Sequence, residues 1–216
     1  GERNKQGIGP YDPVTEADTR AEEVMREHLA KVAPDDGVNG EEFGIKDGKS
    51  GWTWYLDPVD GTRAFVAGLP SWTTLIACVQ DETPLIGIID QPYLRERYVG
   101  WTDGAFLDSS TSRTALSVSG KDKLTDAILS TTDPFILTPS ERGAFEHLRA
   151  TARLTRYGLD AYAYARLAAG TIDIVTEGGL QPHDVAALIP VVRGAGGLAT
   201  TWRGQEAKLG AQIVCA

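Results

Sequence analysis

Four segments between residues 52 and 101 constrain the fold of this chain more than any other part of its sequence. They are rich in β-branched and aromatic residues, and turn-forming residues separate them, which predicts strands of a largely antiparallel sheet. The four segments are "WTWYLD", "SWTTLIACVQ", "PLIGIID" and "ERYVGW". Upstream, residues 16–33 have apolar side chains at helical spacing and predict an amphipathic helix with Thr15 as its N-cap.

The pattern changes beyond Ser119, where helices and strands begin to alternate. The spacing predicts helices over residues 139–151 and 160–170, a strand over 171–177, and a helix over 183–197 that ends at glycine. Because sheets and helices bury their apolar faces against one another, these predicted elements favour a layered α+β sandwich. No repeat or low-complexity linker divides the sequence, so we expect one unit over residues 1–216. Its α+β half would cover residues 1–119 approximately, and its α/β half residues 120–216.

The composition is that of an ordinary globular domain, since 216 residues with 42% hydrophobic side chains can bury a sizeable core. No apolar run is long enough to cross a bilayer, and "GERNKQGIGP" lacks the apolar core of a signal peptide. We therefore expect a cytoplasmic protein without a membrane partner. The formal net charge of -9 argues against a nucleic-acid partner, because phosphate contacts require clustered Lys and Arg. Cys78 and Cys215 are expected to be packing residues, and so few Cys and His argue against zinc.

Acidic residues gather in four short motifs, most of them at the boundary of a predicted element. The motifs are "VTEAD" with Asp18, "NGEEFG" with Glu41 and Glu42, "LDPVDGT" with Asp57 and Asp60, and "PHDVA" with Asp184. We expect the strand to end at Asp57, because Pro58 cannot continue the ladder, and a short helix to begin at residues 60–62. Asp57 and Asp60 would then face one point, where their repulsion raises a pKa unless a cation neutralises them. Hard oxygen donors select Mg²⁺ or Mn²⁺.

Taken one at a time, these acidic residues also have structural explanations. The explanations are an N-cap for Asp60, a turn position for Asp57, a capping box for Thr15 and Asp18, a solvated loop for Glu41 and Glu42, and the first helical turn for Asp184. No single motif decides between these explanations and a metal site.

The motifs occur together and in a fixed order. With "PVTEAD", "GEE", "LDPVDGT" and a late "DVAA" helix, the sequence resembles the inositol monophosphatase superfamily over nearly its whole length. The resemblance implies a layered αβαβα sandwich. It also implies a Mg²⁺-dependent phosphomonoesterase that acts on a small phosphorylated metabolite and forms a homodimer.

The resemblance also implies a role for individual residues. The implied metal ligands are Glu41, Asp57, Asp60, Asp184 and the backbone carbonyl of Val59. Thr62 and Asp18 resemble the pair that positions and deprotonates the attacking water, and Glu41 assists through a third ion. Gly61 and Thr62 would offer backbone N–H groups to phosphate, and Lys5 would help to anchor the loop on the metal side.

The chemistry of phosphate esters agrees with these roles. Hydrolysis needs charge neutralisation, an activated water and in-line geometry, which two metal ions about 3.5–4 Å apart supply. Gly61 has no Cβ and lets the backbone approach phosphate at a helix N-terminus. Thr62 can relay a proton from water to Asp18. The bound ions, rather than the net charge, would attract the anionic substrate.

Residues 155–197, with "GLDAYAY", most resemble the histidinol-phosphate phosphatase branch. Asp160 and Glu177 are then expected to recognise the alcohol, since carboxylates form charge-assisted hydrogen bonds with the ammonium and imidazole of histidinol. As structural alternatives, Asp160 caps the following helix and Glu177 ends a strand. His183 stands where the family usually has a Trp or Tyr, which would alter the pocket wall.

Three functions follow from this sequence. The first is a Mg²⁺-dependent hydrolysis of L-histidinol phosphate, with Mn²⁺ as an alternative ion. The second is a phosphatase for inositol-1-phosphate or bisphosphate nucleotides. The third, of another class, is a non-catalytic binding or regulatory member of the family, against which the presence of every expected metal and water-activating residue argues.

Overall fold

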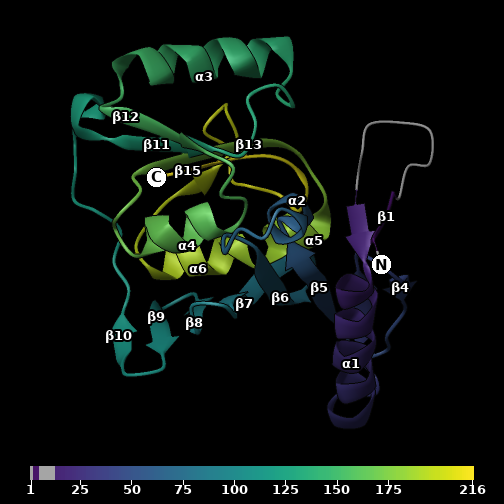
Figure 1. The fold of residues 1–216 in the computed structure, drawn as a ribbon. Helices are drawn as coiled ribbons and strands as arrows, with labels where there is room; N and C mark the ends of the chain where they lie inside the picture. Colours follow the sequence, from purple (N-terminus) through teal and green to yellow (C-terminus); the bar gives the residue numbers. More distant parts are fainter. Residues whose placement is uncertain (1, 5–12) are drawn as a thin grey trace.

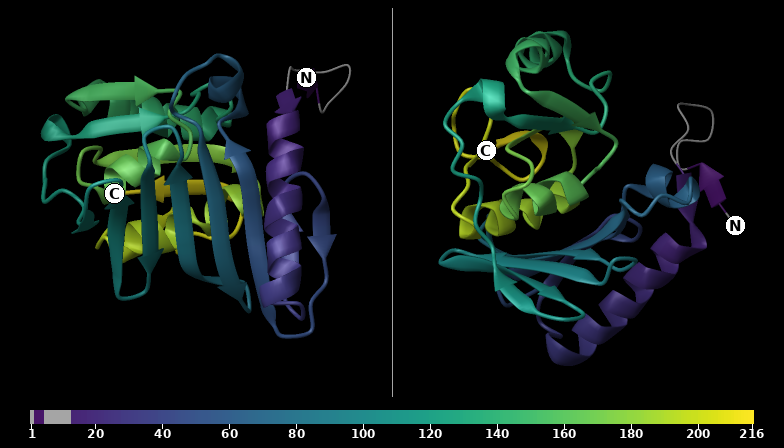
Figure 2. Two further views of the ribbon diagram at one scale, coloured as in Figure 1. Left: turned by 60° about the horizontal axis from the view of Figure 1, so that its bottom comes forward. Right: turned by 60° about the vertical axis from the view of Figure 1, so that its left-hand side comes forward.

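The computed structural model describes residues 2–4 and 13–216, and its elements form stacked layers (Figure 1). Helix α1 (Glu16–Val32) covers one face of a large sheet, and helix α3 (Pro139–Thr151) covers the outer face of a smaller sheet (Figure 2). Three short helices lie between the sheets, namely α4 (Tyr162–Ala168), α5 (Pro182–Ala186) and α6 (Leu188–Gly194). This order of layers confirms the predicted αβαβα sandwich. No helix in the described ranges is long and apolar enough to cross a membrane.

The large sheet has eight strands in the order β10-β9-β8-β7-β6-β5-β3-β4. All neighbours are antiparallel except β3 and β5, which confirms the largely antiparallel sheet expected from the four strand-like segments. The strands are β3 (Gly37–Gly40), β4 (Gly44–Lys46), β5 (Trp52–Asp60), β6 (Thr73–Gln80), β7 (Thr83–Gln91), β8 (Glu96–Trp101), β9 (Gly104–Ser109) and β10 (Arg113–Ala115). A separate antiparallel pair, β1 (Glu2–Asn4) with β2 (Pro13–Thr15), leads into α1.

The smaller sheet has five strands in the order β12-β11-β13-β15-β14. Strand β11 is parallel to both of its neighbours, whereas β15 is antiparallel to both of its own. The strands are β11 (Ile128–Thr131), β12 (Leu154–Tyr157), β13 (Ile174–Leu180), β14 (Ala199–Thr200) and β15 (Ala211–Cys215), and a 3₁₀ turn η1 (Leu124–Asp126) precedes them. The largest hydrophobic core lies between the two sheets and includes Cys215, which is a buried free thiol. Cys78 is also buried and free, as expected of packing residues.

The single helix predicted over residues 183–197 is wrong, because the chain forms α5 and α6 with a break at Ala187. Pro190 lies three residues after this break. It has no N–H to donate to the carbonyl of Ala186, so one continuous ladder of helical hydrogen bonds cannot form. In place of the helix predicted over residues 160–170, the chain forms the shorter α4 (Tyr162–Ala168). Asp160 lies outside this helix because its φ of 49° is not helical.

The prediction that β5 ends at Asp57 is also wrong, since the strand continues through Pro58 to Asp60. Asp57 pairs with Leu75 and Asp60 pairs with Thr73, so two residues of β5 lie opposite one residue of β6. This bulge leaves the missing N–H of Pro58 without consequence. Residues three apart on a regular strand point to opposite faces, and the extra residue brings Asp57 and Asp60 to the same face.

Helix α6 approaches the large sheet so closely that glycine is required at the contact. A Cβ at Gly100 on β8 would lie 2.3 Å from the Cα of Val191, and a Cβ at Gly87 on β7 would lie 2.1 Å from the carbonyl oxygen of Ala187. The layer of short helices is therefore seated on the sheet by backbone contact. This seating determines how far Asp184, on the adjacent α5, lies from the carboxylates of β5.

We predict that Gly100→Ala lowers the free energy of unfolding by at least about 2 kcal/mol, because the new methyl group would overlap the backbone of α6. Gly143→Ala is the matched control, since this glycine is exposed within α3 and the added Cβ would point into open space. It should raise the stability by about 0.5–1 kcal/mol through helix propensity. Urea unfolding monitored by circular dichroism measures both changes. Equal effects of the two substitutions would contradict the close approach.

Candidate active site

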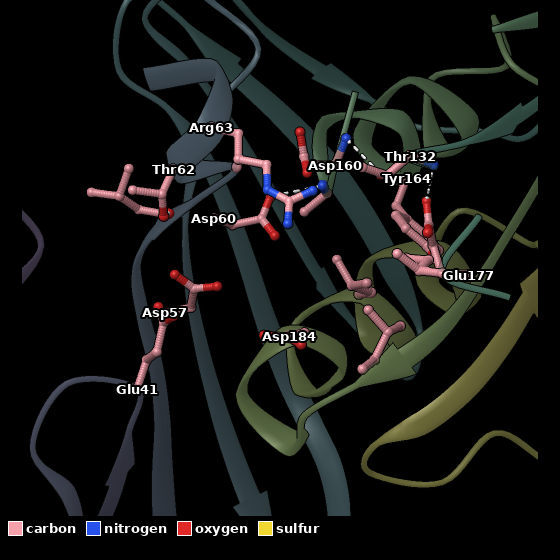
Figure 3. Close-up of a pocket in the computed structure, with 16 residues that line it drawn as sticks. Glu41, Asp57, Asp60, Thr62, Arg63, Thr132, Asp160, Tyr164, Glu177 and Asp184 are labelled. Carbon is pink, nitrogen blue, oxygen red and sulfur yellow. Dashed lines mark hydrogen bonds between the residues drawn. The ribbon is translucent and has the colours of Figure 1, made fainter. Parts of the chain in front are cut away.

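A pocket of about 260 Å³ lies where β5 and α2 (Thr62–Val66) meet elements of the smaller sheet and the short helices (Figure 3). Its polar lining comes from Glu41, Asp57, Asp60, Thr62, Arg63, Thr132, Asp160, Tyr164, Glu177 and Asp184. Its remaining lining comes from Val59, Gly61, Ile136, Ala161, Leu180 and Leu188. The pocket thus brings together nearly all of the residues that the sequence predicts for the site. Asp18 is the exception and does not line it.

Asp57 lies beside Glu41 on one side of the pocket (Figure 3). Burial raises the pKa of its carboxyl group well above the usual value. The charges of Glu41, Asp60 and Asp184 and a side-chain hydrogen bond with Glu41 raise it further. Its Oδ1 atom is buried and has no hydrogen-bond partner within the described ranges. Glu41 therefore faces this pocket rather than belonging to a fully solvated loop.

Asp60 links strand β5 to the residue that precedes α4. Its Oδ2 atom accepts a hydrogen bond from the backbone N–H of Ala161 at 2.7 Å and from the hydroxyl of Thr73 at 3.2 Å. Burial and the charge of Asp160 raise the pKa of Asp60, and these two hydrogen bonds offset part of the rise. The N-cap explanation for Asp60 is wrong, since Gly61 occupies that position and no side chain caps α2.

Asp184 lies in the first turn of α5, which confirms the structural explanation that the sequence offered for this residue. Its Oδ2 atom accepts a hydrogen bond from the backbone N–H of Gln181 at 2.7 Å, and its Oδ1 atom lies 3.3 Å from Nε2 of His183. The carboxylate also lines the pocket, so a capping role and a place in the site coexist in one residue. His183 is not part of the pocket lining.

The donor set fits a hard divalent cation. Carboxylate oxygens and a carbonyl are the ligands that Mg²⁺ prefers, and the mutual repulsion that raises the pKa of Asp57 is what a cation would relieve. Over the described ranges, however, no three His, Cys, Asp or Glu side chains lie close enough together to form a ready-made metal site. The carboxylates would have to move closer together to hold an ion jointly.

Gly61 forms the turn between β5 and α2 with a φ of 79°, a left-handed conformation that favours glycine. A Cβ at this position would lie 3.0 Å from Oδ2 of Asp160, so Asp160 lies directly over the turn. The hydroxyl of Thr62 donates a hydrogen bond to the carbonyl oxygen of Val59 at 3.0 Å. Thr62 therefore gives its one hydroxyl proton to β5 and not to Asp18.

Asp18 is fully buried and belongs to the capping box of α1. Its Oδ2 atom accepts hydrogen bonds from the backbone N–H and the hydroxyl of Thr15, which confirms Thr15 as the N-cap and the capping-box explanation. Its Oδ1 atom is buried and without a hydrogen-bond partner in the part of the chain that the structure describes. Lys5, the other residue expected near this end of the site, lies outside the described residues.

Asp160 and Glu177 line the opposite part of the pocket (Figure 3). Burial raises the pKa of Asp160 to about 6, and the charge of Arg63 opposes this rise. Burial raises the pKa of Glu177 to about 8, against hydrogen bonding from Thr132. Both structural alternatives are wrong, because no side chain caps α4 and Glu177 lies within β13 instead of at its end.

Thr132, Arg63 and Tyr164 are pocket residues that the sequence analysis did not identify. The backbone N–H of Thr132 donates to Oε1 of Glu177 at 2.6 Å, and its hydroxyl accepts from the backbone N–H of Asp160 at 3.1 Å. Thr132 thereby joins the carboxylate of Glu177 to the backbone of Asp160. Arg63 directly follows the "DPVDGT" motif, and this position could have identified it as a pocket residue. The sequence around Thr132 contains no motif that would have identified Thr132.

Comparison with known proteins supports the resemblance to the inositol monophosphatase superfamily over the whole chain. The family model of the inositol monophosphatase family matches residues 2–216. The chloroplastic bifunctional phosphatase IMPL2 of Arabidopsis thaliana is 40% identical over 90% of this chain and 56% of its own length, so the chain spans little more than half of that protein. The histidinol-phosphatase of Mycobacterium tuberculosis is 38% identical over 94% of this chain and 79% of its own length.

A solved structure of an inositol monophosphatase from Zymomonas mobilis has the same fold, with a TM-score of 0.85 and 35% sequence identity. The match covers 99% of this chain and 81% of that one. The order of the motifs, the layers of the fold and these similarities agree, and this chain belongs to the inositol monophosphatase family.

Proposed function

We propose that this protein is a Mg²⁺-dependent phosphomonoesterase that hydrolyses L-histidinol phosphate to L-histidinol and phosphate. The observation that carries the proposal is the gathering of six carboxyl groups around the Gly61 turn in one pocket. Two further observations support it. Relatives that are named as phosphatases are similar over most of this chain, and one of them is a histidinol-phosphatase.

In this proposal, Mg²⁺ is held by Glu41, Asp57, Asp60, Asp184 and the carbonyl of Val59, and Mn²⁺ is the alternative ion. When bound, the metal neutralises the phosphate, activates the attacking water and stabilises the leaving oxygen. Residues 1–119 would supply the metal side and residues 120–216 the alcohol side, except that Asp184 would reach the metal side from the second half.

Gly61, Thr62 and Asp18 would act on the phosphate and the water. The backbone at Gly61 can approach phosphate because no Cβ intervenes, and the N–H groups of Gly61 and Thr62 would bind its oxygens. Thr62 would turn its hydroxyl away from Val59 and pass a proton from the water to Asp18. The buried Oδ1 of Asp18, which has no hydrogen-bond partner among the residues that the structure describes, supports this role. The packing of α2 beside β2, the strand that leads to Asp18, also supports it.

Asp160 and Glu177 would bind the ammonium and imidazole groups of histidinol. Glu177 is buried and Asp160 is partly buried, and both carboxyl groups have a raised pKa. Each therefore lacks a sufficient positive partner in the pocket. A cationic substrate would supply that partner and restore the ionised form. Charge-assisted hydrogen bonds between carboxylate and ammonium are about twice as strong as neutral ones, which favours histidinol over an uncharged polyol.

Inositol-1-phosphate is the second candidate substrate. With a pKa of about 8, Glu177 is protonated near pH 7 and can donate a hydrogen bond to a neutral hydroxyl group. The similarity to the inositol monophosphatase of Zymomonas mobilis also supports this candidate.

The proposal is tested by steady-state hydrolysis of histidinol phosphate, inositol-1-phosphate and an adenosine bisphosphate in the presence of Mg²⁺. We expect the highest kcat/KM with histidinol phosphate, loss of activity in EDTA and its return when Mg²⁺ is added. A higher value with inositol-1-phosphate would favour the second candidate. Turnover of none of the three would contradict the enzymatic function and favour a binding role.

Asp57→Asn should reduce kcat by at least about 10²-fold, because it removes a charged oxygen donor from the proposed metal site. The melting temperature without divalent ions should stay the same or rise, since the neutral amide relieves the repulsion around Asp57. Asp47→Asn, on an exposed residue, is the control and should change neither quantity. A near-normal kcat for Asp57→Asn would exclude the metal role.

Asp160→Asn should lower kcat/KM for histidinol phosphate by about 10- to 100-fold, which corresponds to the loss of one charged hydrogen bond. Inositol-1-phosphate serves as the control substrate for the same variant, because a hydroxyl group gains less from a charged partner. Its kcat/KM should fall by less than about threefold. Equal losses for the two substrates would remove the argument for a contact with the amine.

A further inference from the structure

The loop that carries Glu41 is held by a buried side chain of helix α1. This loop, residues 40–44, consists of the turn over residues 41–43 together with Gly40, which ends β3, and Gly44, which begins β4. Oε2 of Glu22 accepts a hydrogen bond from the backbone N–H of Glu42 at 2.7 Å, and its Oε1 atom accepts one from the N–H of Phe43 at 3.2 Å. Glu22 is fully buried although it is charged, so these contacts take the place of water.

Arg26 completes the arrangement one helical turn further along α1. Its Nε atom lies 2.7 Å from Oε1 of Glu22, and its guanidinium also donates to the carbonyl oxygen of Gly44. The pair therefore binds three consecutive residues of the loop, two through Glu22 and one through Arg26. An ion pair with this many hydrogen bonds holds a backbone segment in one position.

Gly40 is the position that allows this contact. A Cβ there would lie 2.0 Å from Oε1 of Glu22 and 2.8 Å from Nη2 of Arg26. On the other side, the backbone N–H of Glu41 donates to the carbonyl oxygen of Leu56 on β5 at 3.1 Å. The loop is thus fixed between α1 and β5, and the side chain of Glu41 is left to face Asp57 (Figure 3).

We propose that Glu22, together with Arg26, is a positioning residue that determines the affinity of the site for Mg²⁺ by holding Glu41 against Asp57. This inference rests on the proposed function, because it requires Glu41 and Asp57 to bind the ion. Glu22 itself does not line the pocket and would touch neither the ion nor the substrate. Its effect would pass through the backbone of residues 42–43.

The test is the binding of Mg²⁺ alone to the complete chain, measured by isothermal titration calorimetry and by the rise in melting temperature with added MgCl₂. Glu22→Gln keeps the size of the side chain but turns an N–H group toward one of the loop N–H groups. It should weaken Mg²⁺ binding by about 10- to 100-fold, the range typical of partners that orient metal ligands. Its kcat at saturating Mg²⁺ should stay within about threefold of the wild-type value, unlike that of Glu41→Gln.

Glu23→Gln is the matched control, with the same chemical change on the next residue of α1. Glu23 is exposed, and its carboxylate pairs with Arg20 at 3.0 Å instead of with the backbone of the loop. Its substitution should leave Mg²⁺ affinity unchanged. A purely structural role of Glu22 would lower the melting temperature without changing the Mg²⁺ affinity of the folded protein.

Unchanged Mg²⁺ affinity in folded Glu22→Gln would overturn the inference. Where that variant does not fold, Arg26→Lys decides by the same criterion, because lysine keeps the charge but cannot bind Glu22 and Gly44 in the same fork geometry. If the wild-type protein itself bound no Mg²⁺, the proposed function would fail together with this inference. If the wild type binds and both variants bind equally well, only the positioning role fails.

Discussion

Repulsion between buried carboxyl groups is the constraint on which the arrangement of this molecule depends. Six carboxyl groups line one pocket, Asp57 and Glu177 among them buried and the other four partly buried. Burial together with the mutual charge raises the pKa of Asp57 and Asp60. Hydrogen bonds from neighbouring residues oppose the rise in pKa, from Ala161 to Asp60 and from Thr132 to Glu177. The Glu22 and Arg26 pair acts differently, because it holds the backbone of the loop that carries Glu41.

Two backbone features set the geometry on which these contacts depend. The bulge at Pro58 and Val59 turns Asp57 and Asp60 to one face of β5, and the glycines on β7 and β8 let the short helices sit directly on the large sheet. Asp184 and Asp160 come from the layer of short helices and the segment before it. The two features together bring carboxylates from distant parts of the chain into the same 260 Å³ pocket.

The two ends of the pocket differ in what neutralises their charge. At the Asp57 end, four acidic side chains and a carbonyl offer hard donors to a divalent cation. At the other end, the charge of Arg63 offsets the effect of burial on Asp160 only in part, so the pKa of Asp160 stays near 6. Hydrogen bonding from Thr132 likewise offsets the effect of burial on Glu177 only in part, so the pKa of Glu177 stays near 8. The proposed substrate, a phosphorylated molecule with a cationic alcohol, would match this difference, because its phosphate and its amine require opposite partners.

The sequence by itself determined the features that depend on local spacing. The helix that begins at residue 16 with its Thr15 cap and four strands of the large sheet could be predicted, since periodicity and capping act over a few residues. The layered αβαβα fold was implied by the family resemblance, which rests on the order of the acidic motifs along the chain. Three features were decided by tertiary structure alone. Strand β5 continues through Pro58, Thr132 forms hydrogen bonds with both Asp160 and Glu177, and Glu22 binds the backbone of the loop after Gly40. The physical reason is that these contacts depend on strand register, close backbone approach and hydrogen bonds between residues about 20 to 50 positions apart, which local spacing does not encode.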